Sequence, residues 1–156
     1  MRLYLVQHAE ALPESVDAER RLSARGREDA MRIAAFLGVA GVRVSRVLHS
    51  GKARACETAE ILTAHMPAGV PMGILVGMAP YDPVDSFAAR VADLDANTML
   101  VGHLPFMARL ASALVAGREE PTICAYRPGS VVCLEQDEAG CWTMAWMLHP
   151  DLFAGR

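Results

Sequence analysis

The sequence lacks any hydrophobic run long enough to cross a membrane. The first apolar stretch, Leu3 to Val6, lasts only about four residues before Gln7. A membrane span needs about 20 apolar residues, and the core of a signal peptide needs about 7 to 15. We therefore predict a soluble, unprocessed cytoplasmic protein with no membrane partner.

An excess of positive charge is also missing, since the formal net charge is −3. A protein that binds nucleic acid usually carries a basic patch, so we expect no nucleic-acid partner. The four cysteines show no CxxC spacing, and their positions beside the histidines do not indicate a zinc site. No GxxxxGK[ST] loop is present either. We therefore expect no metal, no cofactor and a reducing compartment.

Length and composition favour one domain spanning residues 1–156 and acting as a monomer. The chain is 53% apolar and 21% charged, which is enough for one buried core. Strand-like and helical patterns alternate along it, and this predicts a single three-layer αβα domain with a mostly parallel central sheet. We expect strands at 2–7, 42–48, 70–76, 98–101, 130–135 and 142–148, and helices after Ser23 and at 52–65, 83–94 and 105–115.

Local signals fix several of these elements. Ser23 has the position of an N-cap, and Gly38 and Gly41 are expected to end the helix that follows it. Pro71 favours an edge position for the third strand. In the last strand, Trp142, Met144, Trp146 and Met147 are predicted to pack in the core by simple alternation.

Three apolar runs each end at a polar cluster that contains His or Arg. His8 follows the first strand, Arg54 follows the second, and His103 follows the strand that begins at Thr98. Ligands of open α/β sheets bind at the carboxyl ends of the strands. We therefore expect His8, Arg54 and His103 to meet in one pocket.

These side-chain types suit phosphoryl transfer. An imidazole can attack phosphorus, and a guanidinium group matches phosphoryl oxygens with its planar set of donors. Taken alone, His8 and His103 would more often be structural histidines, but the motifs around them favour a site. We expect structural or surface roles for the other histidines and the nearby acids, namely His49, His65, His149, Glu10 and Asp17.

At these positions the sequence resembles the histidine phosphatase superfamily, also called phosphoglycerate mutase-like. Residues 5–11 resemble its LVRHGEA signature, and residues 21–26 resemble its (R)xLTxxG segment. Residues 47–60 resemble its vlxSPxxRaxqTAE segment, and residues 101–105 resemble its second-histidine motif. The Leu104-Pro105 continuation and the short chain are most similar to the SixA-type phosphohistidine phosphatases.

This resemblance implies a role for each candidate residue. His8 would be the nucleophile that becomes transiently phosphorylated, Arg54 would clamp the phosphate, and His103 would bind it beside His8. Arg20 or Arg21 would reach the phosphate from the loop. The implied activity is removal of phosphate from phosphohistidine on a protein, as part of signal transduction.

Two departures from the family pattern bear on this activity. Gln7 stands where the family has an arginine before the nucleophile, and Gly77 stands where SixA-like chains often have a glutamate. An amide can bind phosphate by hydrogen bonds but supplies no charge. A phosphatase of small phosphate esters and a binding module that has lost turnover therefore stay open as alternatives.

Overall fold

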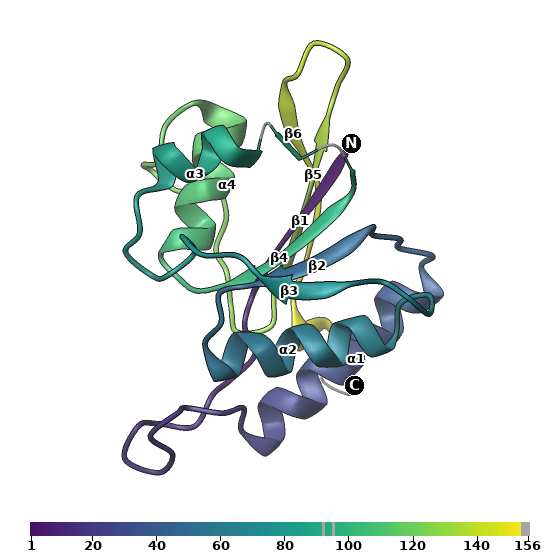
Figure 1. Cartoon of the computed structure of the whole chain (residues 1–156), viewed down its shortest axis with the longest axis vertical. Helices are drawn as coiled ribbons and strands as arrows, with labels where there is room; N and C mark the ends of the chain where they lie inside the picture. Colours follow the sequence, from purple (N-terminus) through teal and green to yellow (C-terminus); the bar gives the residue numbers. More distant parts are fainter. Residues whose placement is uncertain (92, 95, 154–156) are drawn as a thin grey trace.

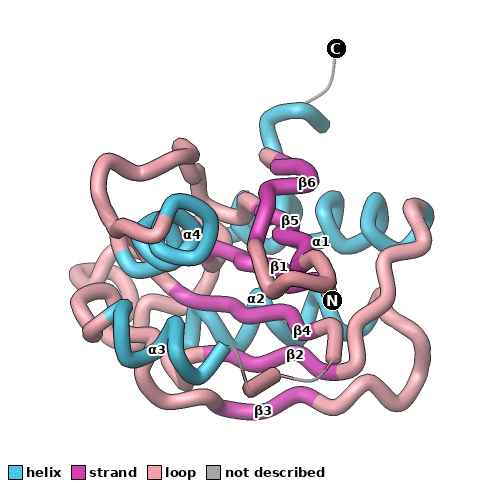
Figure 2. Tube along the Cα trace, turned by 90° about the horizontal axis from the view of Figure 1, so that it is seen from above, coloured by secondary structure: helices cyan, strands magenta, loops and turns pink. Residues whose placement is uncertain are grey.

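The computed structural model describes residues 1–91, 93–94 and 96–153. Its strands form one mixed sheet in the order β3-β2-β4-β1-β5-β6 (Figure 1; Figure 2). The first four strands in that order are parallel, and β5 and β6 add an antiparallel hairpin. The strands are β1 (Arg2–Gln7), β2 (Arg46–His49), β3 (Met72–Ile74), β4 (Thr98–Gly102), β5 (Val131–Gln136) and β6 (Trp142–Leu148).

Helices cover both faces of this sheet, and Figure 1 shows one pair on each side. One face carries α1 (Ala24–Val39) and α2 (Ala53–Ala64), and the other carries α3 (Val84–Val91) and α4 (Phe106–Ala116). A short 3₁₀ helix, η1 (Pro150–Phe153), follows the last strand. The predicted αβα fold with a mostly parallel sheet is confirmed.

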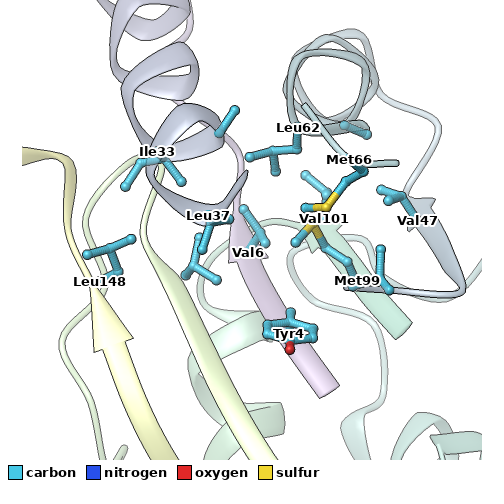
Figure 3. Close-up of a cluster of buried hydrophobic side chains, with 14 of the residues drawn as sticks. Tyr4, Val6, Ile33, Leu37, Val47, Leu62, Met66, Met99, Val101 and Leu148 are labelled. Atoms are coloured by element: carbon cyan, nitrogen blue, oxygen red, sulfur yellow. The ribbon is translucent and has the colours of Figure 1, made fainter. Parts of the chain in front are cut away.

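The first strand lies inside the sheet because it is apolar on both faces. β1 pairs with β4 on one side and with β5 on the other, and Leu3 to Val6 are at most 1% exposed. Tyr4 and Val6 pack against α1 and α2, as Figure 3 shows, whereas Leu3 and Leu5 face the core under α3 and α4. Because β1 is paired on both sides and covered on both faces, the position of its carboxyl end is fixed within the sheet.

The start of α1 is anchored to the loop that follows β1. Ser23 is the N-cap as predicted, since its Oγ accepts a hydrogen bond from the Gly26 amide. A Cβ atom on Gly26 would lie 2.0 Å from the carbonyl oxygen of Glu10, so only glycine fits this approach. The same contact keeps the segment after His8 close to the helix.

Two predicted boundaries of the first helix and second strand are wrong. Gly38 lies inside α1 instead of ending it, and a Cβ atom there would come within 3.2 Å of the His65 carbonyl oxygen. Its small size therefore serves the packing of α1 on the end of α2. The second strand begins at Arg46 and not at Val42, because its partner β4 begins only at Thr98, opposite Arg46.

The expected alternation of β6 is also wrong. A register shift in the β5–β6 pair sets Trp146 opposite Cys133 but Met144 opposite Leu134. Trp142 and Met144 therefore join the core under α3 and α4, while Trp146 packs against the α1 face. The bulge adds one residue to β6, so the side chains after it point to the opposite face of the sheet from the one that simple alternation predicts.

The remaining predicted elements are present, most of them within one residue of the expected bounds, whereas β3 and α3 are shorter. The third strand is an edge strand as expected, limited to β3, and the hairpin of β5 and β6 occurs as predicted. The helix expected at 83–94 is α3, which ends at Val91; residue 92 lies outside the described residues. No helix of the described part of the chain is long and apolar enough to cross a membrane.

Candidate active site

The register of the parallel strands brings the two candidate histidines together. Gln7 of β1 lies opposite Gly102 of β4, so His8 and His103 each follow directly on neighbouring strands. The His8 amide donates to the Gly102 carbonyl oxygen at 2.9 Å, and the two imidazole rings are 5.0 Å apart between centroids. A phosphoryl group could contact both rings at this separation.

One hydrogen bond fixes the protonation pattern of His8. Its Nδ1 lies 2.7 Å from the carbonyl oxygen of Ala9. A carbonyl oxygen only accepts, so Nδ1 carries the proton and the lone pair of the neutral ring is on Nε2. This Nε2 is the atom that could attack phosphorus.

Arg54 is held close to the same loop by a threonine in the next turn of α2. Thr58 Oγ1 donates to the Arg54 carbonyl oxygen at 2.7 Å and accepts from the Ala9 amide at 3.1 Å. The first turn of α2 is therefore tied to the residue that follows His8. Arg54 Nε is buried without a hydrogen-bond partner, so this donor is available to an anion.

The structure distinguishes Arg20 from Arg21. Arg20 adopts a left-handed backbone conformation with φ of 52°, and its Nε donates to the Leu12 carbonyl oxygen at 3.2 Å. Its positive charge acts on both His8 and His103. Arg21 is half-exposed and pairs with Asp17 and Glu19 on the loop. The alternative in which Arg21 binds the phosphate is therefore not supported by its position.

Gln7 is nearly buried at the base of the site. Its side chain is 8% exposed, and its Oε1 has no hydrogen-bond partner. Rotating the side-chain amide of Gln7 by half a turn would exchange its oxygen and nitrogen, so that the NH₂ group would occupy the position of Oε1. Gln7 can thus donate to an anion, although without the charge of an arginine.

Burial and neighbouring cations keep both histidines neutral. The pKa of His8 is lowered to about 4, chiefly by desolvation; the Ala9 carbonyl opposes the shift, and the charges of Arg54 and Arg20 add to it. The pKa of His103 is lowered to about 3, chiefly by desolvation and also by the neighbouring His8, Arg54, Lys52 and Arg20. The chain as a whole has a net charge of −3, but the charged groups that act on these two histidines are cations.

In the part of the chain that the structure describes, no acidic side chain is bonded to the histidine pair. Among the described residues, no carboxylate forms a hydrogen bond or ion pair with His8, Arg54 or His103, and no group of three His, Cys, Asp or Glu side chains could hold a metal ion.

Gly77 has a φ of +101°, and a Cβ atom there would lie 3.0 Å from Arg90 Nη1. A side chain is strained at this position whatever its chemistry.

Sequence reasoning missed two polar residues that organise the site. Ser50 Oγ lies 2.6 Å from His103 Nε2, and Thr58 connects Arg54 with Ala9. Ser50 directly follows β2, so its place at a strand end was the signal that could have identified it. The other histidines have structural contacts: His49 Nδ1 accepts from the Gly51 amide, His65 bonds the Ile61 carbonyl oxygen, and His149 bonds Ser130 Oγ.

Proteins similar to this chain were found by sequence and by structure. Phosphohistidine phosphatase SixA of Escherichia coli K12 is 24% identical over 155 residues, which cover 96% of this chain and 94% of SixA. An uncharacterized protein of Picosynechococcus sp. is 31% identical over 125 residues, or 76% of this chain and 75% of that protein. No protein-family model matches the sequence.

The fold agrees with these similarities. The solved structure of the protein histidine phosphatase SixA complexed with tungstate superimposes with a TM-score of 0.87, covering 98% of this chain and 99% of that one at 24% identity. The fold and the paired histidines thus define a phosphoglycerate mutase-like protein. The chain is closely related to SixA and to members of the histidine phosphatase superfamily in sequence and structure.

The depressed pKa values predict how the histidines respond to pH. An unfolded histidine has a pKa of about 6.5, so the unfolded chain binds protons that the folded chain excludes between that pH and the folded pKa values of about 4 and about 3. The stability contributed by the neutral rings is complete above about pH 6.5 and is lost as the pH falls from there through the folded pKa values of about 4 and about 3. Titration of labelled imidazoles by NMR in anion-free buffer should show His8 and His103 neutral at pH 5.5. If either ring titrates near 6.5, the site is not desolvated as described.

Proposed function

We propose that the protein is a phosphohistidine phosphatase that acts through a phosphorylated His8. The observation that supports this best is the hydrogen bond from His8 Nδ1 to the Ala9 carbonyl oxygen, because it leaves the Nε2 lone pair free beside a cluster of cations. A neutral, desolvated imidazole is a competent nucleophile at neutral pH. The phosphoryl-binding groups are Arg54, His103, Gln7 and Arg20.

The reaction has two transfers. In the first, His8 Nε2 forms a bond to phosphorus while the phosphorus–nitrogen bond of the substrate breaks. The other ring nitrogen of the substrate phosphohistidine carries a proton, so the substrate leaves with the electron pair as a neutral imidazole. In the second, water attacks phosphorus, the bond to His8 Nε2 breaks, and inorganic phosphate is released. Positive charge from Arg54 and Arg20 stabilises the phosphoryl oxygens in both transfers.

The lack of an acid beside the histidines favours phosphohistidine over alkyl phosphate esters. An alkoxide leaving group needs a proton donor, but among the described residues no carboxylate is hydrogen-bonded to His8 or His103. An imidazole, whose conjugate acid has a pKa of about 6.5, leaves far more easily. The site is therefore suited to a labile phosphorus–nitrogen bond.

The surroundings fit a protein substrate. A hollow of about 460 Å³ beside Arg54 is open to solvent and is also lined by Glu19, Gly51, Lys52 and Cys56. A phosphohistidine on the surface of another protein can approach such an opening. Four free cysteines are consistent with a reducing cytoplasm, where a monomeric phosphatase of this kind would act in signal transduction.

Phosphate release tests this function. The wild type should release phosphate from phosphoramidate and from a phosphohistidine protein, and His8→Ala should lower turnover by at least about 1,000-fold because it removes the nucleophile. His65→Ala is the matched control, since His65 is an exposed residue near the end of α2. His49 is less suitable because it bonds the Gly51 amide. A folded wild type that releases no phosphate but binds it would indicate a binding module.

Gln7 predicts a gain of activity. Gln7→Arg adds a charge-assisted hydrogen bond, which contributes about 1.5 to 3 kcal/mol, so turnover of phosphoramidate should rise about ten-fold or more. Gln7→Lys is the control, because it adds charge without the planar pair of donors and should gain less. Equal turnover of wild type and Gln7→Arg, with folding confirmed by circular dichroism, would mean that Arg20 already supplies the missing charge.

A further inference from the structure

Ser50 is fixed against His103 by the backbone of the sheet. It directly follows β2, and its amide donates to the Val101 carbonyl oxygen at 3.2 Å, which continues the pairing of β2 with β4. Because His103 follows β4, the two side chains meet at the same edge. Ser50 Oγ lies 2.6 Å from His103 Nε2, a short distance for a hydrogen bond between a hydroxyl and an imidazole.

The contacts of Ser50 favour one direction for this hydrogen bond. A hydroxyl has one proton to donate and two lone pairs to accept with. The Lys52 amide already donates to Ser50 Oγ at 3.4 Å. His103 Nε2 is the remaining partner of Ser50 Oγ in the described part of the chain, so it is the acceptor that the hydroxyl proton requires.

The second ring nitrogen of His103, Nδ1, indicates how the Ser50–His103 hydrogen bond could help to bind an anion. His103 is 1% exposed, and its Nδ1 is buried without a hydrogen-bond partner. Arg54 Nε is buried and unpaired in the same site. If Nε2 accepts from Ser50, the proton of the neutral ring is on Nδ1. Two buried N–H donors then lack an acceptor beside His8, and a phosphoryl oxygen is an acceptor of the required kind.

We propose that Ser50 is a positioning residue that holds His103 in the tautomer with its proton on Nδ1, so that the neutral ring donates a hydrogen bond to a phosphoryl oxygen. This inference rests on the proposed function for the identity of the ligand. The reverse tautomer would direct a lone pair toward the anion and would weaken binding. Ser50 thus acts on the phosphoryl group only through His103.

Nitrogen-15 NMR of the imidazole rings tests the inference directly. Wild-type His103 with saturating inorganic phosphate should show a protonated Nδ1 and an unprotonated Nε2. Ser50→Ala should transfer proton occupancy to Nε2, whereas Ser50→Thr keeps the hydroxyl and should keep the wild-type pattern. Ser86→Ala is the control, since Ser86 bonds the Pro83 carbonyl oxygen on the exposed side of α3.

Affinity for inorganic phosphate provides the second readout. Ser50→Ala should weaken binding about ten-fold, as expected for one lost hydrogen bond, and Ser50→Thr should restore most of it. A protonated Nε2 in the phosphate-bound wild type would overturn the role of Ser50, even if Ser50→Ala failed to fold. If the tautomer is as proposed but the wild type releases no phosphate from phosphoramidate, the proposed function fails and the role of Ser50 in anion binding stands.

Discussion

The parallel pairing of β1 with β4 is the constraint on which the site depends. Opposite residues at the carboxyl ends of these strands, Gln7 and Gly102, place His8 and His103 side by side. β2 adds Ser50 on the other side of β4, and α2 follows from the same strand with Arg54 in its first turn. A slip of one residue in this register would turn each side chain to the opposite face and separate the histidines.

Burial and nearby positive charge determine the protonation states of the side chains at this edge of the sheet. Arg54 has a lowered pKa because of burial and the nearby charge of Arg20, and the histidines are neutral for related reasons. Arg54 Nε is a buried donor without a hydrogen-bond partner, which is unfavourable. An anion that accepts a hydrogen bond from this donor offsets that cost, which is a physical reason for the phosphate binding that we propose.

Local sequence signals identified the elements but not the contacts between them. The apolar run of β1, the Ser23 cap and the strand-end positions of His8 and His103 are local properties, and the sequence was sufficient for each. The start of β2 depends on where β4 begins, and the faces of β6 depend on a bulge, so both needed the tertiary structure. The same is true of Arg20, whose direction depends on the conformation of the loop, and of Ser50, whose partner lies 53 residues away.

The central claim is that His8 Nε2 attacks phosphorus and forms a covalent intermediate. Rapid quenching of the wild-type protein with phosphorus-32-labelled phosphohistidine protein, followed by peptide mapping under alkaline conditions, measures this directly. The account predicts one acid-labile phosphoryl group per chain, located on His8 and absent from the His8→Ala variant. Label on His103, or phosphate release with no label on the enzyme at any time, would contradict it.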